Sequence, residues 1–178
     1  MLEIFNDLEL KRQGTQDGLP REEGEALYTF IKEHQIKKVV ETGIKHGFSS
    51  CYILAALPPD GELISLEANK APHIGSVVPA EYQSRWKIIY GLSKEKLQEI
   101  FLLNQEVDLF FHDSEHHYEN QMFEYETALP FINFIGSHDI RLYGPVFAWE
   151  TFIKKHNIKV LVDLGQLGIG QVSKESCR

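Results

Sequence analysis

The feature that most constrains the fold is a regular alternation of short apolar runs with longer stretches of helical periodicity. The short runs are rich in Val, Ile, Leu and Phe, as in buried strands, whereas the longer stretches repeat apolar residues at helical spacing. We expect strands within 36–43, 61–67, 86–91, 107–113 and 133–140, and helices within 20–34, 48–57, 94–103, 118–129 and 146–156. This alternation predicts an α/β fold, in which right-handed crossovers build a mostly parallel sheet with helices on both faces.

The C-terminal part of the chain departs from the alternation. Two apolar runs, 159–165 and 168–174, follow each other with only a short Gly-containing turn between them. A strand, a tight turn and a second strand predict a hairpin, which adds one antiparallel strand to the sheet. In open sheets of this kind ligands bind at the carboxyl ends of the strands, so functional residues are expected directly after each strand.

Length and charge narrow the class of protein. The 178 residues suit one domain, which we expect over 20–178, with residues 1–19 as a loose arm. The net charge of −8 and the lack of any Lys/Arg run longer than two disfavour nucleic acid and favour a small-molecule partner. The two cysteines form no CxxC, and neither a membrane-length apolar run nor a signal-peptide layout is visible, which predicts a cytoplasmic protein away from membranes. The sequence leaves open whether the protein forms a homodimer.

Three strand ends carry residues that suit a nucleotide-like ligand. After the first strand, Gly43 and Gly47 form a G-x-x-x-G turn, which either serves the backbone alone or brings free N–H groups to an anion. After the second, Glu67 either accepts the hydroxyls of a ribose or is a surface carboxylate. After the third, Gly91 and Ser93 either flank a flat ring or begin the next helix.

The fourth strand leads into the histidine-rich stretch FHDSEHHYEN, residues 111–120. Asp113 ends this strand, and the pair His138 and Asp139 ends the fifth. Two aspartates on neighbouring strand ends suit Mg²⁺, and an added imidazole favours Mn²⁺, so we predict Asp113, Asp139 and His138 as metal ligands. The alternative is that the histidines are solvated loop residues; His112 is expected to face away from the cleft, toward the core or solvent.

Six segments resemble a known family when taken in order. They are VVETGIKHGFSS, LISLEA, YGLSKEKL, VDLFFHDSEHHYENQ, SHDIRLYGPVFAWETF and GIGQV, spread from about Pro20 to about Lys174. Their order and spacing resemble the class I S-adenosylmethionine-dependent methyltransferases, especially the methyltransferase domain 24 branch of small-molecule O-methyltransferases. The resemblance implies a Rossmann-like doubly wound sheet of seven strands, in order 3-2-1-4-5-7-6 with strand 7 antiparallel.

The same resemblance implies roles for individual residues. The methionine portion of the cofactor would lie near the first turn, the ribose at the second strand end and the adenine at the third. Asp113 would lie near the methionine amine or a metal, and His116 would be the general base. The residues implied for cofactor binding are Glu41, Gly43, Gly47, Ser49, Glu67, Gly91, Leu92, Ser93 and Asp113.

The expected activity is transfer of a methyl group from S-adenosylmethionine to a hydroxyl of a small sugar or secondary-metabolite acceptor. An imidazole with a pKa near ~6.5 can remove the hydroxyl proton. A divalent Mg²⁺ or Mn²⁺ held by Asp113 and Asp139 could instead lower the pKa of a bound hydroxyl. Two alternatives stay open: a non-catalytic cofactor-binding or regulatory module, and a metal-dependent hydrolase in which Glu67 would be idle. Residues 1–19 and the loop 141–143 are the expected lids.

Overall fold

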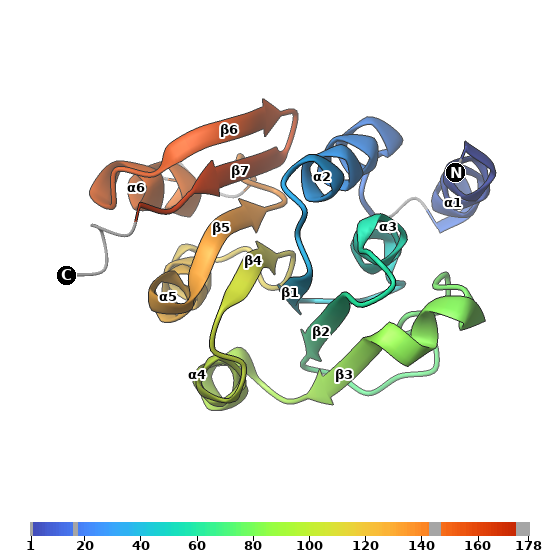
Figure 1. Ribbon diagram of the computed structural model, residues 1–178, viewed down its shortest axis with the longest axis horizontal. Coiled ribbons are helices and arrows are strands. Elements are labelled where there is room, and N and C mark those ends of the chain that lie inside the picture. The colour runs from blue at the N-terminus through green and yellow to red at the C-terminus, as the bar shows by residue number, and fades with distance from the viewer. Residues whose placement is uncertain (1, 16–17, 143–146, 174–178) are drawn as a thin grey trace.

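The computed structural model describes residues 2–15, 18–142 and 147–173, and these ranges form one seven-stranded sheet (Figure 1). The strand order is β3-β2-β1-β4-β5-β7-β6, and β7 runs antiparallel to both β5 and β6 while the other pairs are parallel. The predicted order and the predicted C-terminal hairpin are therefore confirmed. The strands are β1 Lys38–Thr42, β2 Glu62–Glu67, β3 Trp86–Tyr90, β4 Val107–His112, β5 Ile132–Ser137, β6 Lys159–Leu164 and β7 Leu167–Gln171.

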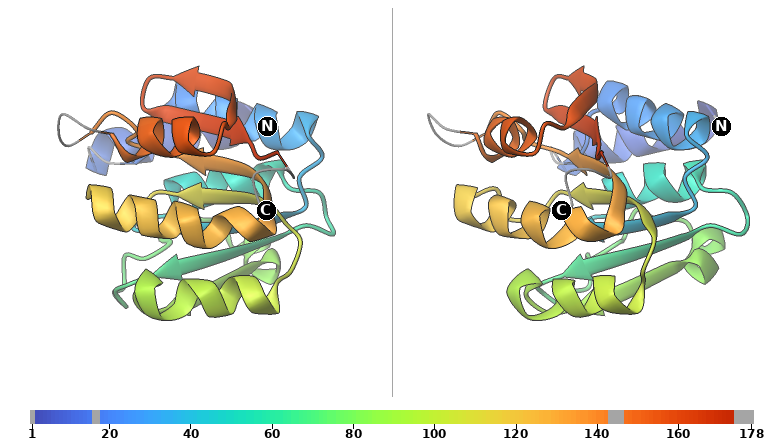
Figure 2. Two further views of the ribbon diagram at one scale, coloured as in Figure 1. Left: turned by 90° about the vertical axis from the view of Figure 1, so that its left-hand side faces the viewer. Right: turned by 60° about the vertical axis from the view of Figure 1, so that its left-hand side comes forward.

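Helices cover both faces of the sheet, as two further views show (Figure 2). On one face α1, α2 and α3 pack over a hydrophobic cluster, and on the other α4, α5 and α6 cover a second one. Central strands supply both clusters because successive side chains point to opposite faces: Val39 belongs to the first cluster and Val40 to the second. The helices are α1 Leu2–Thr15, α2 Arg21–Glu33, α3 Phe48–Ala56, α4 Ser93–Leu103, α5 Tyr118–Ala128 and α6 Ala148–Lys155, with 3₁₀ turns at Ala80–Arg85 and Leu129–Phe131.

The ends of the expected elements shift slightly. The helix expected over 146–156 is described from Ala148 to Lys155, and its expected first residue, Val146, lies outside the described residues. Tyr143, in the expected lid loop 141–143, also lies outside the described residues. Within the part of the chain that the structure describes, no helix combines the length and the apolar character needed to cross a membrane.

The N-terminal segment corrects one expectation. Instead of a loose arm, Leu2–Thr15 forms the helix α1. Phe5 is 4% exposed, and its ring centroid lies 5.2 Å from that of Tyr28 in α2 and 5.1 Å from that of Tyr52 in α3. Leu8, one turn further on, is also buried. The polar residues between these two anchors hid the helix from a reading based on periodicity, because tertiary packing rather than propensity holds it in place.

Phe5→Ala tests this docking. We expect the free energy of unfolding to fall by about 3 kcal/mol, because a buried aromatic ring leaves a cavity between α2 and α3. Urea denaturation gives this number, and amide hydrogen exchange across α1 should accelerate in the variant. The matched control is Leu10→Ala on the same helix, whose side chain is 69% exposed and should change stability by less than about 0.5 kcal/mol. Equal effects at both positions would contradict a docked α1.

Candidate functional site

The parallel strands β2, β1, β4 and β5 end at the same edge of the sheet, and a large cavity opens there. Its volume is about 720 Å³, within the usual range for ligand sites. Residues after three strands line it: the turn after β1, Glu67 at the end of β2, and Asp113 after β4. The segment after β3 closes the far side with Gly91, Leu92 and Ser93.

The turn after β1 requires both of its glycines. Gly43 has φ +82°, and a Cβ there would lie 2.1 Å from the carbonyl oxygen of Asp113. Gly47 has φ +89° directly before α3, and a Cβ there would lie 2.8 Å from a methyl of Val78. The backbone conformation and the close packing of this G-x-x-x-G turn are therefore sufficient to explain why both positions are glycine. Gly43 also lines the large cavity, so its backbone borders the space in which a ligand would bind.

Glu67 binds the backbone of the same turn. Its Oε2 accepts the N–H groups of Ile44 at 3.0 Å and Lys45 at 3.2 Å, and its Oε1 accepts the N–H of Asn69 at 3.0 Å. Each carboxylate oxygen has further acceptor capacity beyond these bonds. Glu67 therefore shapes the turn and still offers acceptor capacity to the cavity that it lines.

Glu41 lies beneath the turn rather than in the cavity wall. It is fully buried, and its carboxylate accepts hydroxyl hydrogen bonds from Ser49 at 2.7 Å, Ser50 at 2.6 Å and Ser65 at 2.7 Å. Burial raises the pKa of Glu41 to about 7, although the three hydroxyls act in the opposite direction. Glu41 thus supports a ligand site only indirectly, because it fixes the position of the turn and of α3.

The adenine side of the predicted site is partly open. Leu92 is an apolar side chain that is 55% exposed while lining the cavity, which suits contact with a flat ring. Ser93 begins α4, and its hydroxyl donates to Asn120 at 3.4 Å. Ser93 is the first residue of α4 and also lines the cavity, and its position beside a flat ring stays a prediction.

A second cavity of about 400 Å³ lies beside the first. The two share Ile44, Lys45, Asp113 and Ser114 in their walls. The second is lined in addition by three groups predicted for chemistry, His116, His138 and Asp139, and by Ser49 and Gly18. Asp113 thus stands between a large cavity and a smaller, more polar one.

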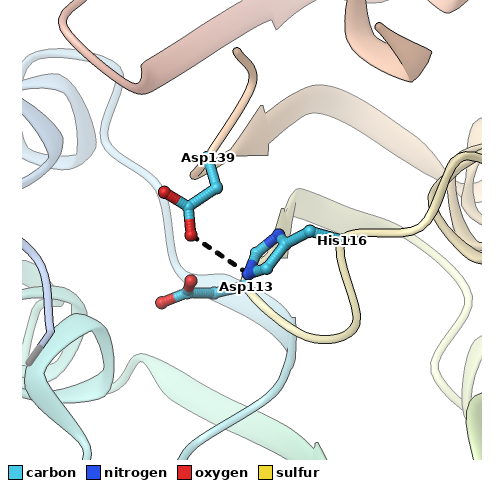
Figure 3. Close-up of side chains that lie close together, drawn as sticks. All are labelled: Asp113, His116 and Asp139. Carbon is cyan, nitrogen blue, oxygen red and sulfur yellow. Dashed lines mark ion pairs between the residues drawn. The ribbon is translucent and has the colours of Figure 1, made fainter. Parts of the chain in front are cut away.

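His116 and the two aspartates come together as the sequence predicted (Figure 3). The Nε2 of His116 lies 3.1 Å from Oδ2 of Asp139, and the Nδ1 is buried without a hydrogen-bond partner among the described residues. Burial lowers the pKa of His116, and the neighbouring His112 ring adds to this effect. Because a carboxylate only accepts hydrogen bonds, Nε2 of the neutral ring carries the proton and donates to Asp139, and the lone pair lies on Nδ1. Asp139 itself has φ +55°, a left-handed conformation that Asp tolerates.

His138 differs from the prediction. Its Nδ1 faces Asp113 at 3.3 Å and Asp139 at 3.5 Å, and its Nε2 lies 3.0 Å from Oε2 of Glu23 in α2. Burial opposes a charged ring, but the contacts with Asp113, Asp139 and Glu23 outweigh it and raise the pKa of His138 to about 12. Glu23 was missed because it is 115 residues away in the chain and looks like any other helix glutamate.

The predicted metal ligands can be tested on this donor set. Asp113, His116 and Asp139 each offer a ligand atom, and these atoms lie within 4.8 Å of one another. His138 does not join them, because an imidazolium has no free lone pair for a metal. Its charge also competes for both carboxylates: a divalent ion and an imidazolium about 4 Å apart repel by about 8 kcal/mol at an effective dielectric constant of ~20. A Mg²⁺ or Mn²⁺ ion therefore fits this site poorly while His138 is charged.

A buried carboxylate in the wall of the large cavity was also missed by the sequence analysis. Glu124 in α5 is 1% exposed and accepts hydrogen bonds from Thr42 at 2.5 Å, from Asn120 at 3.0 Å, from Ser114 at 3.0 Å, and from His112 Nδ1 at 2.8 Å. Burial opposes ionisation, but the contacts with His112 and Thr42 lower the pKa of Glu124 overall. His112 faces the core, one of the two directions expected, and helps to fix the ends of β1 and β4.

Comparison with known sequences identifies the class. The family profile described as a methyltransferase domain matches residues 40–139, more than half of the chain, and the chain belongs to this family. The matched range contains Gly43, Glu67, Asp113 and His116. A search of curated proteins gives no match.

Solved structures share the fold. An O-methyltransferase from Bacillus cereus, in complex with SAH, has a TM-score of 0.70 at 15% identity, covering 95% of this chain and 90% of that one. The O-methyltransferase TomG from Streptomyces achromogenes, involved in tomaymycin synthesis and in complex with SAM, has a TM-score of 0.73 at 15% identity, with coverage of 96% and 90%. A methyltransferase from Geobacter sulfurreducens has a TM-score of 0.74 at 14% identity, with coverage of 96% and 89%.

The pH dependence of stability tests the environment of Glu41. Because the pKa of Glu41 rises from 4.5 to about 7 on folding, the folded state holds its proton more tightly than the unfolded chain. Stability should therefore fall as the pH rises from about 4.5 to about 7, by roughly 3 kcal/mol in total. Urea denaturation of the wild type and of Glu41→Gln, which lacks this titration, isolates the effect. A stability difference that stays constant across this pH range would contradict the assignment.

Proposed function

We propose that this protein is an S-adenosylmethionine-dependent O-methyltransferase that acts on a hydroxyl of a small molecule. The observation that carries the proposal is the pair of adjoining cavities: Asp113 stands between a large one with Glu67 on its wall and a polar one with His116. The family match supports the same cofactor, as do the SAH and SAM complexes of two solved structures with this fold. Residues 20–178 would form the catalytic domain, against which the helix α1 packs.

The cofactor would occupy the large cavity. Glu67 would accept the ribose hydroxyls with the capacity that the turn amides leave, and Gly91, Leu92 and Ser93 would border the adenine. The methionine portion would lie over Gly43, with its amine toward Asp113. The turn itself rests on the buried set Glu41, Gly47 and Ser49.

The acceptor would occupy the smaller cavity, next to the transferred methyl. Its hydroxyl oxygen attacks the methyl carbon in line as the carbon–sulfur bond breaks and the sulfonium becomes a neutral thioether. His116 would take the hydroxyl proton, and the imidazolium formed would be stabilised by Asp139, whose carboxylate already faces Nε2. The polar walls of this cavity favour a hydroxyl-rich acceptor such as a sugar or a secondary metabolite.

The other candidates account for less of the site. A metal-dependent hydrolase would leave Glu67 and the large cavity without a role, and the charged His138 competes with a metal for the carboxylates. A non-catalytic cofactor-binding module would use the large cavity alone. A cytoplasmic location and a homodimer stay predictions from the sequence.

Calorimetric titration tests cofactor binding. We expect both S-adenosylmethionine and S-adenosylhomocysteine to bind the wild type, and Glu67→Ala to weaken both by about 10- to 100-fold, since hydrogen bonds to a charged group are lost. Glu99→Ala, at an exposed position on α4, is the matched control and should leave affinity unchanged. Failure of both ligands to bind would reject the methyltransferase proposal, and undiminished binding by Glu67→Ala would reject the ribose assignment.

His116→Ala tests the proposed base. We expect cofactor affinity to stay within about two-fold of the wild type, because His116 lines only the smaller cavity. Turnover, measured as S-adenosylhomocysteine formed with a panel of sugars and phenolic acceptors, should fall by about 10²- to 10⁴-fold. His117→Ala, at the exposed neighbouring histidine, is the control. Turnover that survives in His116→Ala would assign catalysis to proximity alone, and a panel without any turnover in the wild type would favour the binding module.

A further inference from the structure

Three carboxylates surround one imidazole ring at the floor of the smaller cavity. They come from three separate elements: Glu23 from α2, Asp113 from the segment after β4, and Asp139 from the segment after β5. The side chain of His138 at their centre is only 11% exposed. Both of its ring nitrogens face carboxylate oxygens, at 3.0 Å on the Nε2 side and at 3.3 and 3.5 Å on the Nδ1 side.

One carboxylate next to Nε2 and two next to Nδ1 favour a charged ring. An ionised carboxylate only accepts hydrogen bonds, and a neutral imidazole carries a proton on only one of its two nitrogens. A neutral His138 would therefore turn a lone pair toward a carboxylate, whereas an imidazolium donates on both sides. The backbone at His138 is also fixed, because its N–H donates to the carbonyl of His112.

Glu23 is held as firmly as the ring that it contacts. Its second oxygen, Oε1, accepts the N–H of Gln166 at 2.9 Å in the turn between β6 and β7. A Cβ at the neighbouring Gly165 would lie 2.3 Å from the same oxygen, so the turn closes tightly over this carboxylate. Glu23 is itself 7% exposed. A carboxylate is thus kept buried on the Nε2 side of His138.

We propose that His138, held as an imidazolium by Glu23, is a built-in cation that draws the carboxylates of Asp113 and Asp139 together and directs Asp139 toward His116. It occupies the role that a divalent ion would otherwise have between two aspartates at neighbouring strand ends. His138 and Glu23 are then positioning residues, since they act through Asp139 on the proposed base. The positioning role of His138 and Glu23 in catalysis rests on the proposed function. The charge of His138 and its competition with a divalent metal ion do not.

Replacing the ring by a carboxylate tests the competition. Calorimetry with Mn²⁺ in the absence of any cofactor should show no binding by the wild type up to millimolar concentrations. His138→Asp removes the cation and adds an oxygen ligand next to Asp113 and Asp139, so it should bind Mn²⁺ at least 100-fold more tightly. His117→Asp makes the same chemical change at a histidine whose side chain is 76% exposed, and should behave as the wild type. Micromolar Mn²⁺ binding by the wild type would overturn the proposal.

A second measurement applies to the unmodified protein and so does not depend on the folding of a variant. Long-range ¹H–¹⁵N spectra at pH 8 should show that both ring nitrogens of His138 carry a proton. Glu23→Gln should weaken this signature, because an amide accepts a hydrogen bond without supplying the charge. A neutral His138 ring in the wild type would overturn the proposal whatever His138→Asp does.

These outcomes are separable from those of the proposed function. Neither measurement uses S-adenosylmethionine or an acceptor, so a protein that binds no cofactor could still show the built-in cation. Where turnover is found, His138→Gln should lose it, and Mn²⁺ should restore part of it in His138→Asp but not in His138→Gln. Equal turnover in the wild type and in His138→Gln would remove the positioning role.

Discussion

The parallel pairing of β1 with β4 is the constraint on which the rest of the site depends. The register places Thr42 beside His112, and the N–H of Asp113 donates to the carbonyl of Thr42 at 2.9 Å. Gly43, the first residue after β1, then approaches the Asp113 backbone so closely that no side chain fits. The two strand ends therefore diverge from a shared backbone contact, and the cavities form on either side of it.

Buried carboxylates secure this contact from below. Glu41 collects the hydroxyls of three serines under the turn after β1, and Glu124 collects donors from the ends of β1 and β4. Isolated buried charges are costly, but each of these carboxylates is surrounded by donors that satisfy its oxygens. The site is thus held by buried polar networks, and Glu124 also lines the larger cavity.

Much of the fold could be predicted from the sequence because it depends on local patterns of apolar residues. Apolar runs and helical periodicity gave the strand order once the family resemblance was added, and the hairpin at the C-terminus was visible in the spacing of its two runs. The predicted positions of Gly43, Glu67, Asp113 and His116 all depend on one local rule, that function follows strand ends. The helix α1 was missed because its anchors, Phe5 and Leu8, acquire meaning only against α2 and α3.

What could not be read was the pairing of distant polar groups. Nothing near Glu23 distinguishes it from the exposed glutamates around it, and its partner His138 is 115 residues away. His138 was consequently taken for a metal ligand, since a histidine beside an aspartate has the same local appearance whether it is neutral or charged. Its charge state depends on three carboxylates from three elements, and these carboxylates come together only in the tertiary structure.

The hydrogen bonds between Glu67 and the turn after β1 also bear on the speed of ligand capture. Because the amides of Ile44 and Lys45 are already held by this carboxylate, the turn needs little further ordering when a ligand enters the cavity. Association would then be governed by diffusion and by the electrostatic field at the opening rather than by a slow loop closure. On an acidic protein of net charge −8, that field favours the approach of a positively charged sulfonium over that of an anion.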